Sequence, residues 1–376
     1  MPKPVKICFV GFYARPLFQP ARTGDIGGAE VQLYTLAREL AQDSGFRVDF
    51  IVRDEQRGSE TIDGVTVHKL ALISRPGQGR QLAYAAGLWR LLWTIHPDVV
   101  VQRAAGALTA LLGLYCALHR KRFAYMTAAD SDVEPEKPAG FPGSAAWQAY
   151  RLGLRLADRV IVQHDRQRQR LLENYGKAGI ARPCALEAGE AMPAGVRRNI
   201  LWVGRCERIK QPEMFVSLAQ VFPQESFVMV CPPAASGAAY FESVRNQALR
   251  QRNLTFVEHV PFREIAAYFQ AAALFVNTSI QEGFPNTFVQ AWMHGAPVVS
   301  LSVDPGSVMA RHGLGISCDG SQAALETALA TLLADQPLRE RLSLDAYAYA
   351  HKHHDIRRQV ELDRLWISGL GDSCAE

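Results

Sequence analysis

The sequence has 376 residues, of which 48% are hydrophobic and 21% are charged. At roughly 150 residues per domain this length favours two globular domains, and the composition excludes a disordered chain, a fibrous repeat and a single small stapled domain. The formal net charge of +4 is too small by itself to imply nucleic acid, so we expect no such partner.

The seven cysteines form no CxxC pair, which argues against a disulfide framework and a zinc site and favours a reducing cytoplasm. The N-terminal residues MPKPVKICFVG are typical of a first strand rather than a signal peptide. The longest uncharged, mostly apolar stretch covers the 15 residues 104–118. Because a spanning helix needs roughly 18 residues, we expect a buried helix there and a cytoplasmic protein.

Five short apolar runs occupy the first half of the chain, with helical patterns between them, at 6–10, 47–52, 98–102, 122–126 and 159–163. Each run is apolar on successive residues, as in a parallel strand covered on both faces. The pattern predicts a doubly wound α/β domain over residues 1–190.

Periodicity is lost at 182–198, as in a connection between domains, and a second series of strands follows at 199–204, 226–231, 254–259, 273–278 and 297–301. We therefore predict a second α/β domain over residues 191–353 and a C-terminal helical segment, 354–376, that crosses back to the first. Neither GxxxxGK[ST] nor GxGxxG occurs, which disfavours an ordinary P-loop and an ordinary dinucleotide site.

Glycines precede the first long helix, which is expected to open near Ala29. Gly24, Gly27 and Gly28 would let backbone amides and the helix N-terminus approach an anionic or sugar ligand. The alternative is a simple turn before a helix.

Two cations flank the first strand-to-helix connection of the second domain. Arg205 follows a strand and Lys210 precedes a helix, so together they can neutralise a diphosphate. The alternative is solvated surface charge, as we expect for Arg197, Arg198 and Arg208.

The stretch from Asn277 is the most informative in the chain. It places Glu282 and the turn Gly-Phe-Pro-Asn-Thr, residues 283–287, between a strand and a short helix. An anion can sit on the amides of that helix start, and Glu282 can accept from hydroxyl groups. These groups suit a polyol phosphate.

The GGAE loop, the G-R-x4-K element and EGFPNTFVQAWMHGAPVVS together resemble retaining glycosyltransferase family 4. The resemblance implies the GT-B fold, two Rossmann-like domains facing across a cleft, with a nucleotide-diphosphate sugar as donor and a glycan or lipid-linked glycan as acceptor. It further implies polysaccharide biosynthesis at the cell surface, no cofactor and no metal. Catalytic roles fall to Arg205, Lys210 and Glu282, and donor contacts to Gly27, Gly28, Gly204, Val260, Gly283, Phe284, Pro285, Asn286, Thr287 and Gln290.

Gln290 departs from the family pattern, which has a ribose-binding glutamate at this position. Its amide oxygen can still accept a hydrogen bond, without charge assistance. Alternatively, Thr287 and Gln290 form a helix capping box, a structural role that does not require the nucleotide. A rival function is a degenerate family member that binds sugar nucleotide or glycan without turnover. A sugar-nucleotide epimerase or phosphorylase on the same fold is disfavoured by the EGFPNT helix.

The segment TAADSDVEPE departs from the family as well, because many members carry a histidine there. Asp130 is a fourth catalytic candidate that can accept a hydrogen bond from a sugar or acceptor hydroxyl, or it is an ordinary loop or cap aspartate. His164 has no partner at metal-ligand or triad spacing, so we predict no role for it. The further acceptor-side candidates are Arg103, Asp132, Gln163 and Gln167.

Cations and aromatics mix in the predicted helices 79–96 and 145–159, and the run RQRQR at 166–170 adds charge. Such a surface can rest on anionic lipid at the inner membrane face, where a lipid-linked acceptor would be found. The alternative is two helices packed on a sheet with their arginines snorkelling to solvent.

Overall fold

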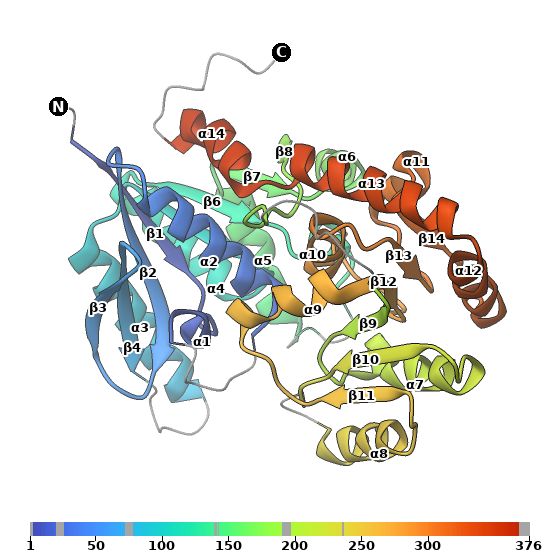
Figure 1. The fold of residues 1–376 in the computed structure, drawn as a ribbon. Helices are drawn as coiled ribbons and strands as arrows, with labels where there is room; N and C mark the ends of the chain where they lie inside the picture. The colour runs from blue at the N-terminus through green and yellow to red at the C-terminus, as the bar shows by residue number, and fades with distance from the viewer. Residues whose placement is uncertain are drawn as a thin grey trace. The chain divides into compact units, whose positions relative to one another are not determined.

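The computed structural model describes residues 3–19, 26–71, 78–138, 141, 143–189, 197–234 and 237–367 (Figure 1). The chain divides into two compact units. One comprises Met1–Pro183 with Ile356–Glu376, and the other comprises Cys184–Asp355. The boundary predicted at 190 and 191 falls in residues 190–196, outside the described part of the chain.

The first unit is built on an eight-stranded sheet of order β3-β4-β2-β1-β5-β6-β7-β8. Its neighbours pair in parallel except β3, which is antiparallel to β4. The strands are β1 (Val5–Val10), β2 (Phe46–Asp54), β3 (Gly58–Ile62), β4 (Val65–Ala71), β5 (Val99–Arg103), β6 (Arg122–Met126), β7 (Arg159–Val162) and β8 (Gly179–Ala181). The helical segments are α1 (Arg15–Phe18), α2 (Gly28–Ala41), α3 (Gln78–Ile95), α4 (Leu108–His119), η1 (Asp130–Val133), α5 (Ser144–Leu156), α6 (Asp165–Tyr175) and α14 (Ile356–Ile367).

The second unit has a six-stranded, wholly parallel sheet of order β11-β10-β9-β12-β13-β14. The strands are β9 (Asn199–Val203), β10 (Ser226–Val230), β11 (Leu254–Val257), β12 (Ala272–Asn277), β13 (Val298–Ser300) and β14 (Gly315–Ser317). The helical segments are η2 (Arg208–Lys210), α7 (Pro212–Val221), α8 (Ala238–Leu249), η3 (Phe262–Glu264), α9 (Ala266–Ala271), α10 (Asn286–Met293), η4 (Pro305–Ser307), α11 (Val308–His312), α12 (Gln322–Ala334) and α13 (Gln336–His353). The strand order reverses between β9 and β12, which is the dinucleotide-binding pattern.

Helices cover both faces of each sheet, which confirms the prediction of two parallel-sheet α/β domains. In the first unit α3, α4 and α5 share one core with the strands, and aromatic contacts of Phe18 and Tyr34 place α1 and α2 on the opposite face. In the second, α7, α8 and α12 cover one face, while ring contacts of Phe275 place α9 and α10 on the other. Strands buried on both faces explain why the apolar runs were visible in sequence.

Helix α14 returns to the first unit, where it packs on α2. Arg122 donates to the carbonyls of Trp366 and Ile367 at 2.8 and 2.5 Å, and Arg182 pairs with buried Asp363 at 3.1 Å. The C-terminal segment therefore completes the sheet domain that the N-terminus begins.

Candidate functional site

Lys210 and Glu282 form the central ion pair of the second unit. Lys210 ends η2, after β9, and Glu282 lies in the loop between β12 and α10. Lys210 Nζ donates to Glu282 Oε1 at 2.6 Å, and the hydroxyl of Ser279 donates to the same oxygen at 2.8 Å. The loops that carry the pair follow β9 and β12, which are adjacent where the strand order reverses, and open α/β sheets generally bind ligands beyond the strand ends at such a point.

Backbone and side-chain bonds hold the two loops of this pair together. Thr278 Oγ1 donates to the carbonyl of Lys210 at 2.6 Å and accepts from Trp202 Nε1 at 2.9 Å. The backbone N–H of Ile280 donates to Ile209 O at 2.9 Å. A Cβ at Gly204 would lie 3.0 Å from the Trp202 ring and 3.2 Å from Lys210 Cδ. Glycine at 204 therefore leaves the space through which the lysine side chain reaches Glu282.

Arg205 is the second predicted cation and lies on the same strand-to-helix connection. One of its guanidinium nitrogens pairs with Glu207 Oε1 at 3.0 Å, and its side chain is about a third exposed. Val260, three residues beyond the end of β11, lies on the other side of β10 from this connection. The structure thus brings Lys210 together with Glu282 but pairs Arg205 with another acid.

The helix start predicted to hold an anion is the first turn of α10. Pro285 is the N-cap residue, and its side chain makes no cap hydrogen bond to the first turn. The predicted capping box of Thr287 and Gln290 is wrong, because Thr287 already lies inside the helix. Among the described residues no group hydrogen-bonds to the Gln290 side chain, so its amide is available to a ligand.

The far end of α10 is fixed by Arg197, which we expected to be ordinary surface charge. Its guanidinium donates to the carbonyls of His294 and Gly295 at 2.8 and 2.7 Å and to Ser343 Oγ at 2.7 Å. Burial lowers the pKa of Arg197, and arginine stays charged nonetheless. This cation binds the two carbonyls that directly follow α10, where positive charge also interacts favourably with the helix dipole.

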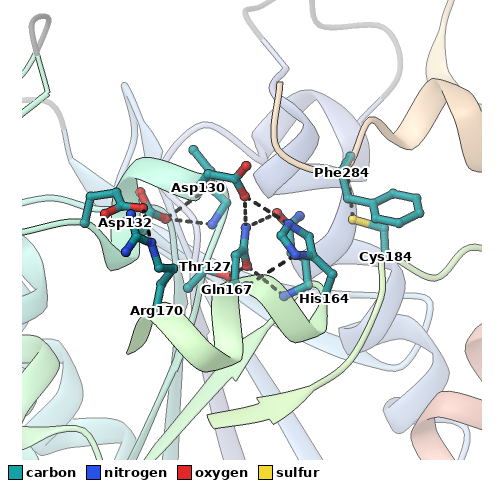
Figure 2. Close-up of polar contacts among 12 residues, drawn as sticks. Thr127, Asp130, Asp132, His164, Gln167, Arg170, Cys184 and Phe284 are labelled. Atoms are coloured by element: carbon teal, nitrogen blue, oxygen red, sulfur yellow. Dashed lines mark hydrogen bonds and ion pairs between the residues drawn. The ribbon is translucent and has the colours of Figure 1, made fainter. Parts of the chain in front are cut away.

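Phe284 contacts Cys184 and His354. The thiol of Cys184 contacts the carbonyl of Phe284 at 3.5 Å (Figure 2). The fully buried ring of His354 donates from Nδ1 to Cys184 O at 2.5 Å, and its centroid lies 5.2 Å from that of Phe284. Burial lowers the pKa of His354 to about 4, so the ring is neutral at pH 7. The loop that carries Glu282 and Gly283 is therefore anchored on a neutral histidine.

In the first unit Asp130 is bound by His164 and Gln167 (Figure 2). His164 Nδ1 accepts from the backbone N–H of Gln167 at 3.3 Å, so in the neutral ring Nε2 carries the proton and donates to Asp130 Oδ1 at 3.0 Å. Burial raises the pKa of Asp130, but the hydrogen bonds from His164 and Gln167 outweigh it and hold this pKa below its ordinary value. Asp130 is an oriented carboxylate whose side chain is 43% exposed.

The expectation that His164 has no partner is therefore wrong. The signal lay in topology, because β6 and β7 pair in parallel and bring the residues after each strand to the same edge of the sheet.

The other acceptor-side candidates of this unit lie in its interior. Gln167 donates to Asp130 and accepts from Thr127 Oγ1 at 2.8 Å and the N–H of Gln163 at 2.9 Å. Asp132 accepts from the amides of Ala128 and Ala129 and from Tyr125. Burial raises the pKa of Asp132 despite these bonds and the positive charge of Arg103.

These placements correct the prediction of direct acceptor contacts. Gln163, Gln167 and Asp132 are each at most 5% exposed and orient the loop that carries Asp130. Arg103 is the last residue of β5, one residue beyond the strand predicted at 98–102, and it is buried as well. Asp130 and Asp132 bind separate sets of donors, so they do not act as one pair.

Gly27 and Gly28 lie at the start of α2, as predicted. Gly27 is the N-cap residue, which has no side chain with which to cap the helix, and Gly28 is the first helical residue. Gly24 lies outside the described residues. The 14-residue helix therefore begins with two glycines, after the carboxyl end of β1.

Two protein-family models match the chain. The model described as "Glycosyl transferase 4-like domain" covers residues 27–184, and that described as "Glycosyl transferases group 1" covers residues 197–335. A D-inositol 3-phosphate glycosyltransferase of Kribbella flavida is 25% identical over 92% of this chain and 91% of its own length. That of Corynebacterium efficiens is 28% identical over 46% of this chain and 44% of its own length, so the match spans less than half of that relative.

Solved structures share the fold. Sucrose-phosphate synthase from Thermosynechococcus elongatus superposes with a TM-score of 0.75 over 97% of this chain and all of its own, at 19% identity. The trehalose-6-phosphate synthase OtsA superposes with a TM-score of 0.68 over 98% of this chain and 99% of its own, at 14% identity. The chain belongs to the group 1, family 4 glycosyltransferases and has the GT-B fold.

Proposed function

We propose that this glycosyltransferase is a cytoplasmic, retaining, metal-independent enzyme. In this proposal it moves a sugar from a nucleotide-diphosphate donor to a glycan or lipid-linked glycan in cell-surface polysaccharide biosynthesis. The Lys210–Glu282 pair, placed at the reversal of the strand order and followed by the N-terminus of α10, carries the proposal. It combines a cation for a diphosphate with a carboxylate for sugar hydroxyls.

Lys210 and Arg205 stabilise the departing diphosphate in this mechanism. A lysine ammonium has three N–H donors and an arginine guanidinium has five, so each can keep its carboxylate partner and still bind phosphate oxygens. The amides at the start of α10 add further donors. Preorganised donors of this kind contribute several kcal/mol to transition-state stabilisation.

The transfer step breaks the bond between the anomeric carbon and the diphosphate oxygen. The acceptor hydroxyl forms the new bond on the same face of the sugar, and its proton passes to an oxygen of the departing diphosphate. No covalent enzyme nucleophile takes part. Asp130 orients the donor or acceptor hydroxyls by accepting a hydrogen bond.

Donor binding is tested by thermal shift with a panel of nucleotide-diphosphate sugars on the wild type and Lys210→Met. We expect one donor to raise the melting temperature of the wild type and not that of the variant. Lys121→Met is the matched control, because Lys121 pairs with Asp98 at 3.3 Å in the other unit. Equal donor shifts in wild type and Lys210→Met would overturn the assignment.

Retention and metal independence are tested on the product of the donor so identified. The anomeric configuration is read by NMR, and inversion would contradict the proposed mechanism. Turnover is expected to be unchanged by a chelator, so its loss on EDTA and recovery with a divalent cation would refute metal independence.

The alternative function is a protein that binds sugar nucleotide without turnover, and Gln290 is the observation that favours it. Gln290→Glu separates the two. A donor shift with transfer in the wild type supports the enzyme, whereas a donor shift without transfer that becomes active in Gln290→Glu supports the binder.

We also propose peripheral contact with anionic lipid through the exposed faces of α3 and α4. Trp93 is 60% exposed and Leu118 is 69% exposed, and Trp93 packs on His119. Arg90 lies on α3, Arg120 directly follows α4, and both are exposed. In the described part of the chain, no helix has the length and apolarity to span a membrane.

The run at 166–170 is a weaker candidate for this surface, because Arg168 pairs with Asp165 and Arg170 with Glu134 and Glu173.

Sedimentation with anionic vesicles tests the proposal of lipid contact through α3 and α4. We expect Trp93→Ser combined with Leu118→Ser to reduce binding, and Leu249→Ser, an exposed leucine of α8, to leave it unchanged. Unreduced binding by the double variant would refute it.

A further inference from the structure

Arg53 lies at the carboxyl end of β2, enclosed by three aromatic rings. It is the penultimate residue of the strand and points to the face that carries α3, since Ile51, two residues earlier, belongs to that core. The guanidinium carbon lies 4.4 Å from the centroid of Phe12, 4.7 Å from that of Tyr84 and 5.5 Å from that of Tyr13. These contacts are cation–π in kind.

Arg53 has no acidic partner within ion-pair distance in the described part of the chain. Among the described residues its side chain makes one hydrogen bond, from Nη1 to Tyr13 Oη at 3.3 Å, and its buried Nε makes none. The neighbouring acids are committed elsewhere, since Asp54 pairs with Arg15 at 2.7 Å, and Glu60 pairs with Arg15 and Lys69. Within the part of the chain that the structure describes, no carboxylate therefore pairs with the positive charge of Arg53.

The backbone fixes the position of this cation. The N–H of Arg53 donates to Phe12 O at 3.0 Å, so the loop after β1 is tied to the end of β2. Phe12 and Tyr84 pack on the core of the unit, whereas Tyr13 is 57% exposed. The site thus has two rigid walls and one ring open to solvent, with a fork of N–H donors between them.

Rigid aromatic walls around an uncompensated guanidinium suit a sugar that carries an anionic group. Phosphate or carboxylate oxygens can take the N–H donors of Arg53, and the exposed face of Tyr13 can pack on the C–H face of a pyranose. In the sheet, β2 and β6 are separated by three strand spacings, about 14 Å, so this site lies apart from Asp130, which follows β6.

We propose that Phe12, Tyr13, Arg53 and Tyr84 form an acceptor subsite that binds a phosphate or carboxylate carried by a sugar. The role of this site as an acceptor subsite rests on the proposed transferase function, whereas the binding of an anionic sugar does not. Binding is measured without donor or turnover, so its failure is distinguishable from failure of the transferase assignment.

The test is ligand-observed NMR on the full chain with glucose 6-phosphate, glucuronate and glucose. We expect at least one anionic sugar to bind tenfold or more tightly than glucose, and the two anionic probes distinguish phosphate from carboxylate. Arg53→Gln is expected to abolish this preference. Arg120→Gln, which removes an exposed arginine of the same unit, is expected to keep it.

Equal affinity of the wild type for all three sugars would overturn the proposal, and so would a preference that survives in Arg53→Gln. Because Arg53 is half-buried, Tyr13→Ala provides a second variant at an exposed side chain. It is expected to weaken binding of the anionic sugars at least threefold without lowering the melting temperature, and unchanged affinity would count against the subsite.

Discussion

Replacing His354 by asparagine should remove a pH dependence from the stability of the second unit. The buried ring has a pKa of about 4, compared with an ordinary value of 6.5. Below pH 6.5 the imidazole of His354 is protonated in the unfolded chain, whereas in the folded protein it stays neutral down to about pH 4. The unfolded state therefore binds more protons in this window, and stability falls as the pH falls through it.

The size of the effect follows from the difference between the two pKa values. A pH of 5 lies 1.5 units below the ordinary histidine pKa of 6.5. The free energy of unfolding is therefore about 2 kcal/mol lower at pH 5 than at pH 7. Asparagine can keep the N–H donor toward Cys184 O but does not titrate in this range. His354→Asn is expected to be less stable at pH 7, because it loses ring contacts with Phe284 and Trp292. By pH 5 this deficit should shrink by about 2 kcal/mol.

The free energy of unfolding of wild type and variant is measured by urea unfolding at pH 7 and pH 5. Fluorine NMR of labelled Trp292, whose ring contacts His354, monitors the transition. His351→Asn is the matched control, since His351 lies in the last turn of α13, which His354 caps, and donates to Tyr347 O, yet is only half-buried. A deficit for His354→Asn that is the same at both pH values would refute the argument from burial.

Three further predictions concern single side chains. Gly204→Ala would press on Trp202 and Lys210, so we expect about 1–3 kcal/mol of destabilisation and weaker donor binding by thermal shift; an unchanged shift would contradict this. His164→Ala removes a hydrogen bond that lowers the pKa of Asp130, so the acid limb of a pH–activity profile should move to higher pH, and an unmoved limb would exclude this role. Arg182→Met leaves Asp363 buried without its cation and should destabilise the first unit by about 3–5 kcal/mol in calorimetry; a loss below 1 kcal/mol would show that the carboxyl is neutral.

The sequence pattern predicted most of the strands because they are buried on both faces and apolar throughout. The edge hairpin of β3 and β4 was not predicted, since β3 reads GSETI and has mostly exposed or half-buried residues. The short strands β8 and β14 contain glycine and lie at sheet edges, so they too lack a clear signal.

The site was predictable where its residues lie close together in sequence. Glu282 and the α10 turn form one motif, whereas His164 and Asp130 are 34 residues apart and meet only through parallel strand pairing. Burial was harder to predict, because the polar residues Gln163, Gln167 and Asp132 satisfy one another and the backbone inside the protein. No local pattern distinguishes such residues from ligand contacts.

The return of α14 to the first unit constrains the order in which the protein can form during synthesis. Residues 184–355 are contiguous, so the second unit can fold as soon as it leaves the ribosome. The first unit must wait for α14, and at roughly 5–20 residues per second the 172 intervening residues impose a delay of about 10–35 s. During that interval Arg182 lacks Asp363, and the surface of α2 that receives α14 is uncovered. During this delay the nascent first unit is therefore expected to expose this surface to chaperones and to aggregation.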